Sequence, residues 1–93
     1  MFNNIKVTED NFKVGDKVVR GEDWKWDNQD GGKGCVGTIE YLSESGNWVN
    51  VKWSNAYPNS YRVGAEGCYD LYFYTGEITD SLMHRMGHLL LNK

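Results

Sequence analysis

The residues that could carry chemistry gather in one short stretch, DWKWDNQDGGKG, which runs from Asp23 to Gly34. It combines aspartates, tryptophans and glycines without the periodicity of a helix or a strand. Clustered carboxylates can hold a metal ion, and glycine-rich turns can hold a phosphate group. Each of these chemistries requires a particular spacing, which the sequence either meets or does not.

A dinucleotide-binding pattern, G-x-G-x-x-G, is matched by GKGCVG at residues 32–37. That pattern binds phosphate where a strand precedes it and a helix begins within it. Here a polar loop comes before it, and the β-branched run VGTIEYL follows. The surrounding sequence therefore excludes a dinucleotide site.

A calcium loop needs oxygen ligands at its first, third and fifth positions, followed by a glycine. Counted from Asp23, the third position is Lys25. Counted from Asp27, the third and fifth positions are Gln29 and Gly31. Neither register supplies the ligands, and we expect no metal ion and no other cofactor.

Two cysteines and two histidines could together form a zinc site, but structural zinc sites normally use closely spaced cysteine pairs. Cys35 and Cys68 are far apart in the sequence, whereas His84 and His88 would share a helix face. The pattern favours free thiols and surface histidines. No G-x-S-x-G motif or other nucleophile–base set is present, so we predict no catalytic residue and no enzymatic activity.

An aromatic cage for a cation is a further possibility, since methyl-lysine readers on small barrels use one. Trp24, Trp26, Tyr57 and Tyr61 could supply its rings. Rings of this size are also the natural core of a small barrel, where each can bury about 150–250 Å². Composition favours the core, and the cage stays open as an alternative.

The elements that must position these residues are short β-strands separated by turns. In WVNVKW, apolar Val49, Val51 and Trp53 alternate with the other three residues, as in a half-buried strand. Short strands at regular spacing are typical of a small barrel or sandwich. We predict an all-β fold of about five to six strands, with the clearest at residues 17–20, 34–42, 48–53, 61–63 and 68–74.

The two ends of the chain have different patterns. Residues 1–11 are a polar N-terminal extension, in which Ile5 and Val7 could add a short edge strand. Residues 79–91 place leucines and methionines at helical spacing and predict a C-terminal amphipathic helix. This helix could close the open end of a barrel, or its apolar face could bind a partner or a second copy of the chain.

The composition limits the class of partner. The chain has 93 residues and a formal net charge of −3, and its basic residues are dispersed. Nucleic-acid binding depends on clustered Lys and Arg, so we expect no nucleic-acid partner. There is no apolar run long enough to span a membrane and no signal-peptide pattern at the start. We expect a cytoplasmic protein, with the nucleus as the alternative location.

Three stretches taken together resemble the MIB/HERC2 domain family. They are VVRGEDWKWDNQDGGKGCVGTI (residues 18–39), VNVKW (49–53) and NSYRVGAEGCYDL (59–71). D-W-x-W-x-x-Q-D-G-G followed by Y-R-x-G-A-E-G-x-Y-D-L is a highly specific combination. The resemblance implies an SH3-like β-barrel over residues 12–74. It also implies a non-catalytic module of E3 ubiquitin ligases that recognises substrates or partners.

From the residues and the resemblance together, we expect a protein or peptide to bind in a groove beside residues 24–30. Aromatic rings would anchor the ligand, while Asp27 and Asp30 would meet basic groups on it. Alternatively, Asp23 and Asp30 bond loop amides or pair with Arg20 and Arg62. The predicted peptide-binding residues are Trp24, Trp26, Asp27, Gln29, Asp30, Tyr57 and Tyr61.

Two other functions remain open at the level of the sequence. One is a reader of methyl-lysine or of a cationic peptide, which would use the aromatic cage. The other is a structural module that self-associates through residues 79–91. A methyl-lysine reader would need its aromatic rings arranged as an open box, which distinguishes it from a peptide-binding groove.

Overall fold

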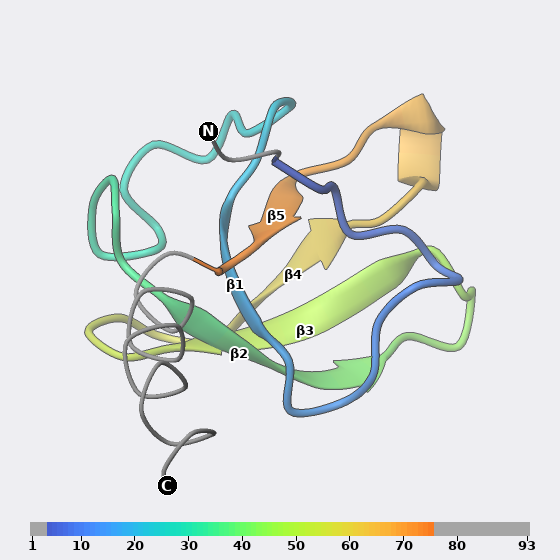
Figure 1. Ribbon diagram of the computed structural model, residues 1–93, viewed down its shortest axis with the longest axis horizontal. Coiled ribbons are helices and arrows are strands. Elements are labelled where there is room, and N and C mark those ends of the chain that lie inside the picture. The colour runs from blue at the N-terminus through green and yellow to red at the C-terminus, as the bar shows by residue number, and fades with distance from the viewer. Residues whose placement is uncertain (1–3, 76–93) are drawn as a thin grey trace, which may run out of the picture.

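Residues 4–75 form five short antiparallel strands, and the predicted all-β class is confirmed (Figure 1). The computed structural model describes residues 4–75, so the helix predicted over residues 79–91 lies outside the described residues. A 3₁₀ turn, η1 (Ala65–Gly67), precedes the last strand. The strands are β1 (Lys17–Arg20), β2 (Gly37–Leu42), β3 (Trp48–Trp53), β4 (Asn59–Arg62) and β5 (Leu71–Phe73).

The strands form one sheet in the order β4-β3-β2-β1-β5. β2 and β3 form its central hairpin, with a bulge between Ile39 and Tyr41. The two ends of the sheet also approach each other, because Val63 and Tyr69 form an isolated bridge between the end of β4 and the segment before β5. The sheet therefore curls back on itself, and the chain that links β4 to β5 joins its two edges.

The N-terminal segment covers the outer edge of β5. Lys6 pairs with Tyr72 in an isolated antiparallel bridge. Val7 donates its backbone N–H to the carbonyl of Leu71 at 2.9 Å, and Val7 itself is fully buried. Figure 1 shows this segment in blue beside the orange β5. The edge pairing suggested by Ile5 and Val7 is present, and it removes an exposed strand edge of the kind that promotes aggregation.

The core follows from strand alternation. In β3, Val49, Val51 and Trp53 are buried, as the sequence predicts. The first residue of β2 is Gly37. A Cβ at this position would lie 2.5 Å from atoms of both the Trp53 and Val51 side chains. Only glycine lets β2 pack this closely. The buried core cluster consists of Val7, Val18, Ile39, Val49, Val51, Trp53, Tyr61, Val63 and Leu71.

Candidate functional site

The long connection between β1 and β2 is fixed to the chain before β5. Gly21 donates to the carbonyl of Asp70, and a Cβ at Gly21 would lie 2.7 Å from backbone atoms of Leu71. The Asp23 carboxylate accepts the N–H of Tyr69 at 2.7 Å. Figure 1 shows the connection as the long light-blue and teal excursion after β1. Its first residues are therefore held as firmly as a strand.

Both tryptophans of this connection are locked in place by their rings and by their N–H groups. The Trp24 ring stacks on Tyr61, with centroids 5.0 Å apart and an interplanar angle of 19°. Its Nε1 donates to the carbonyl of Asp27 at 2.9 Å. The Trp26 ring meets Tyr61 edge-on at 6.4 Å, and its Nε1 donates to the carboxylate of Asp70 at 3.0 Å. Each indole is half-buried, so part of it faces solvent.

Asp30 is the charged centre of the connection. Its side chain is fully buried and accepts Nε and Nη2 of Arg20, both at 2.8 Å, together with the N–H of Gly32 at 3.0 Å. Burial alone would raise the pKa of Asp30, but the bonds from Arg20 and Gly32 outweigh it and lower that pKa below its usual value. Asp30 is therefore an ionised carboxylate whose charge Arg20 already neutralises.

A second arginine–aspartate pair lies deeper. Arg62 donates Nε and Nη2 to Asp70 at 2.9 and 2.8 Å, and its backbone N–H reaches the same carboxylate at 2.9 Å. Arg62 also bonds Glu66 at 2.9 Å and the carbonyl of Asp23 at 3.2 Å. The Asp70 pair raises the pKa of Arg62, so its guanidinium stays charged. This cluster joins β4, the chain before β5 and the connection.

A chain of two hydrogen bonds runs from the buried core to the exposed Gln29 of the connection. Trp53 Nε1 donates to the Tyr61 hydroxyl at 3.1 Å, and that hydroxyl donates to Oε1 of Gln29 at 3.0 Å. Burial raises the pKa of Tyr61, which keeps the phenol protonated as a donor. Gln29 thus fixes the tip of the connection onto the core.

The structure brings together four of the seven residues predicted from the sequence: Trp24 and Trp26 pack on Tyr61, and Gln29 bonds its hydroxyl. Tyr61 has no exposed surface, because it belongs to the core, and it cannot line a groove as we expected. Asp30 is equally buried and is paired with Arg20, so it cannot meet a basic ligand. For Asp30, the structural alternative suggested by the sequence is the one observed.

The remaining two predicted residues face solvent. Tyr57 is 86% exposed and makes no ring contact or hydrogen bond that links it to the other six within residues 4–75. Asp27 is exposed and has a left-handed backbone with φ of 49°, a conformation that Asp tolerates better than most residues. The side chain of Asp27 therefore points to water while its carbonyl holds the Trp24 indole.

The rings do not form an open cage in the described part of the chain. The face of Trp24 is occupied by Tyr61 and by the guanidinium of Arg20, which lies 5.2 Å from its centroid. The Trp26 ring has Arg62 at 5.4 Å and Lys25 at 5.0 Å. The protein's own cations already occupy the positions that a methylated lysine would need.

The outer edge of β4 is partly open. The N–H of Arg62 reaches Asp70, and its carbonyl accepts the Asp70 N–H at 2.9 Å, so both groups point away from β3. Backbone groups alternate along an antiparallel strand, so the N–H and C=O of Ser60 point the same way. Ser60 is exposed, and none of residues 4–75 bonds these two groups. The Trp26 ring, over which the Arg62 guanidinium lies, is beside this edge.

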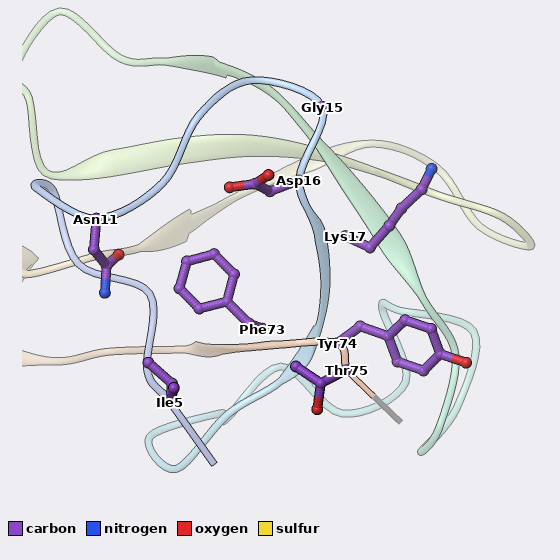
Figure 2. A pocket seen from close by; sticks show the side chains of 8 residues that line it. All are labelled: Ile5, Asn11, Gly15, Asp16, Lys17, Phe73, Tyr74 and Thr75. Atoms are coloured by element: carbon purple, nitrogen blue, oxygen red, sulfur yellow. The ribbon is translucent and has the colours of Figure 1, made fainter. Parts of the chain in front are cut away.

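A hollow of about 540 Å³ lies elsewhere, between the N-terminal segment, the start of β1 and the end of β5. Figure 2 shows the Phe73 ring pointing into it, with Asn11 and Asp16 on its far side. None of the predicted binding residues lines this hollow, and its charged members are Asp16 and Lys17. It is therefore separate from the surface around residues 24–30.

The described residues also bear on metal binding, on cysteine pairing and on membrane-spanning helices. No group of three or more His, Cys, Asp or Glu side chains within residues 4–75 could hold a metal ion. Cys35 and Cys68 are both free thiols. His84 and His88 lie outside the described residues. No helix within the described range is long and apolar enough to cross a membrane.

Sequence reasoning missed Asp70 as the residue that organises the site. Its carboxylate accepts four hydrogen bonds, from the side chain and backbone of Arg62 and from the Trp26 indole. Asp70 lies 44 residues from Trp26, so no local pattern connects them. The available signals were its place in the motif Y-R-x-G-A-E-G-x-Y-D-L and its position directly before an apolar strand.

Comparison with known families identifies the pattern as a whole. The family model described as Mib_herc2 matches residues 15–75, which is most of the chain. This segment contains all five strands, both arginine–aspartate pairs and the whole connection between β1 and β2.

Individual relatives with this segment are E3 ubiquitin-protein ligases. The chain is 56% identical over 55 residues to hecd-1 of Caenorhabditis elegans, a match covering 59% of the chain and 2% of that protein. It is 50% identical over 61 residues to HERC2 of Homo sapiens, covering 64% and 1%. It is 50% identical over 58 residues to mind-bomb of Drosophila melanogaster, covering 62% and 4%. The chain thus matches only a small part of the length of each relative.

Proposed function

This chain belongs to the Mib_herc2 family, and from that premise we propose that it is a non-catalytic module that recognises a protein or peptide for an E3 ubiquitin ligase. Its relatives are named as E3 ligases, but the matched segment is a few per cent of their length or less. So small a shared part favours a recognition role over the ligation chemistry itself. The curled five-stranded sheet also supports the SH3-like barrel that the family resemblance implies.

The observation that carries the proposal is the rigid, half-exposed Trp26 beside the open edge of β4. Its ring is held by Asp70 and Arg62, so little conformational freedom would be lost on binding. The N–H and C=O of Ser60, which no residue within 4–75 bonds, offer two backbone hydrogen bonds to an extended segment. Tyr57, on the same β3–β4 hairpin and 86% exposed, supplies a second aromatic contact.

In this mechanism the predicted residues divide into two roles. Trp24, Trp26, Asp27 and Tyr57 present surface to the ligand, because each keeps exposed atoms. The buried members, Tyr61 and Asp30, and the tip residue Gln29 hold that surface in place. Recognition would therefore depend on a surface that is formed before the ligand arrives.

A matched pair of tyrosine variants tests the proposal. Peptides selected by the intact chain from a random displayed library would be titrated against Tyr57→Ala and Tyr41→Ala. Both tyrosines are exposed, at 86% and 57%, so neither change should unfold the chain. We expect Tyr57→Ala to weaken binding at least fivefold, as for an interface residue worth about 1 kcal/mol or more, and Tyr41→Ala to change it less than twofold.

The proposal fails if no peptide is enriched, or if the two variants bind selected peptides as tightly as the unaltered chain.

The same titration with trimethyl-lysine and unmodified peptides tests the alternative function of a methyl-lysine reader. Because Arg20, Arg62 and Lys25 already lie over the indoles, we expect equal affinity for the two forms. Sedimentation at increasing concentration tests self-association through residues 79–91, which would appear as a concentration-dependent mass.

A further inference from the structure

A row of three side chains crosses the sheet on the face away from the core. Lys17 of β1 is directly opposite Thr38 of β2, and Thr38 is directly opposite Lys52 of β3. Residues opposite each other in antiparallel strands carry their side chains on one face, with Cβ atoms about 5 Å apart. Their neighbours Val18 and Val51 are fully buried, so the row faces outward.

Both lysines of this row are exposed and have no acidic partner in the described part of the chain. None of the five salt bridges within residues 4–75 includes Lys17 or Lys52. The Lys17 ammonium donates instead to Oγ1 of Thr38 at 2.8 Å. Glu40, two residues after Thr38, forms no salt bridge with either lysine. The two lysines lie on strands that β2 separates, so an anion placed over Thr38 could interact with both positive charges.

The surface around the row is concave enough to receive a side chain. Lys17, Thr38 and Lys52 line a hollow of about 330 Å³ together with Val36, Trp53 and Ser54. The Ser54 hydroxyl donates to the carbonyl of Val36 at 3.0 Å, which fixes the rim of this hollow. The two ammonium groups sit on flexible stems and can adjust to a ligand.

The buried and exposed charges of the described residues differ in whether they remain available to a ligand. The two fully buried carboxylates, Asp30 and Asp70, are neutralised by arginines, so they cannot attract a cation. Lys17 and Lys52 are the opposite case, since each residue is exposed and forms no salt bridge with another of residues 4–75. The row itself therefore carries two positive charges, although Glu40 lies two residues further along β2 and the chain as a whole is acidic.

We propose that the Lys17–Thr38–Lys52 row binds carboxylate side chains of an acidic, extended segment of a partner protein. Alternate residues of an extended chain are about 7 Å apart on one side, so two of them can each meet one ammonium group. This inference goes beyond the proposed function, because no residue of the row belongs to the surface formed by Trp24, Trp26, Asp27 and Tyr57. It assigns an acidic ligand to this second surface, whereas the basic segment was expected at the surface around residues 24–30.

Three synthetic peptides of equal length test the sign of the charge. In one, glutamate alternates with serine; in the second, glutamine replaces glutamate; in the third, lysine replaces it. Fluorescence anisotropy at low ionic strength measures their affinity for the intact chain. We expect binding of the glutamate peptide alone, and we expect it to weaken as salt is added, because exposed charge pairs are screened.

Substitution of the lysines tests the location. Lys17→Gln and Lys52→Gln should each weaken binding of the glutamate peptide about two- to fivefold, and the double variant about tenfold. The matched control is Lys13→Gln with Lys33→Gln, which removes the same charge from two exposed lysines outside the row. The control should change affinity less than twofold.

The inference is overturned if the lysine or glutamine peptide binds as well as the glutamate peptide. It is also overturned if the control pair weakens binding as much as the row pair, since net charge alone would then explain the effect. The tyrosine variants separate this outcome from the proposed function. If Tyr57→Ala loses binding of the library-selected peptides but keeps its affinity for the glutamate peptide, the proposed function is supported. The glutamate peptide then binds at a site separate from Tyr57.

Discussion

Two arginine–aspartate pairs in this domain are built alike and placed differently. In each, a bidentate arginine holds a fully buried aspartate and lies over a tryptophan ring: Arg20 with Asp30 and Trp24, and Arg62 with Asp70 and Trp26. The Arg20 side chain is 24% exposed, whereas that of Arg62 is 4% exposed.

The two arginine–aspartate pairs differ in burial, and they also connect different parts of the chain. The Arg62 pair joins three segments of the chain, so the sheet depends on it to bring its edges together. The Arg20 pair joins the end of β1 to the connection that follows it, because Arg20 bonds Asp27, Asn28 and Asp30. Water can partly replace lost bonds to Arg20, but it cannot reach Arg62 in the same way.

The largest expected effect comes from Asp70→Asn. It leaves a buried guanidinium without its counter-charge, and we expect a loss of about 3–5 kcal/mol in the free energy of unfolding. Urea unfolding followed by tryptophan fluorescence measures it. Glu66→Gln is the control, because it removes the other partner of Arg62, whose side chain is 62% exposed, and should cost less than about 1 kcal/mol. Equal losses would show that depth does not decide the energy.

Asp30→Asn should have the second-largest effect, about 2 kcal/mol, since the exposed part of Arg20 stays hydrated after its partner is removed. The same unfolding experiment applies, with Asp27→Asn as the control in the same loop. A loss as large as that of Asp70→Asn would contradict the comparison, because it would make the outer pair as essential as the inner one.

Tyr61→Phe should cost about 1–2 kcal/mol. It removes the hydroxyl that accepts from Trp53 and donates to Gln29, and so leaves a buried indole N–H without a partner. The exposed Tyr57→Phe is the control and should be neutral in thermal unfolding. If Tyr61→Phe were also neutral, the hydrogen-bond chain would not be what fastens the connection to the core.

The smallest effect is a change with pH. The pKa of Asp30 is lowered in the folded protein, so its contribution to stability is present above the unfolded value near 3.8 and is lost as pH falls through the folded value. Unfolding measured between about pH 5 and 2 should show a steeper loss in the unaltered chain than in Asp30→Asn. Parallel curves would contradict the lowered pKa.

Much of the fold was predictable because it rests on local patterns. β1 and β3 were predicted with their observed bounds, and the alternation of Val49, Val51 and Trp53 gave their burial. The β2 strand begins at Gly37 and not at Gly34, because residues 34–36 still belong to the turns of the connection. The bounds of β4 also shifted, from 61–63 to 59–62, since pairing with β3 begins at Asn59.

The candidate site was predictable only in part. The tryptophans and Gln29 gather as expected, because they lie within six residues of one another and share one loop. The burial of Tyr61 and Asp30 could not be predicted from the sequence, since an aromatic ring or a carboxylate can point either into the core or into solvent. The direction was decided by partners that are distant in the chain, such as Trp53 for Tyr61.

The sequence by itself determined the family, the all-β class and the loop that fixes its signature, because these depend on residue types at short spacings. Only the tertiary structure decided which charges remain available. Asp30 and Asp70 meet arginines from other segments and are neutralised, while Lys17 and Lys52 each lie opposite Thr38 and form no salt bridge within residues 4–75. Charge pairing depends on distances through space, and those distances exist only once the strands are in register.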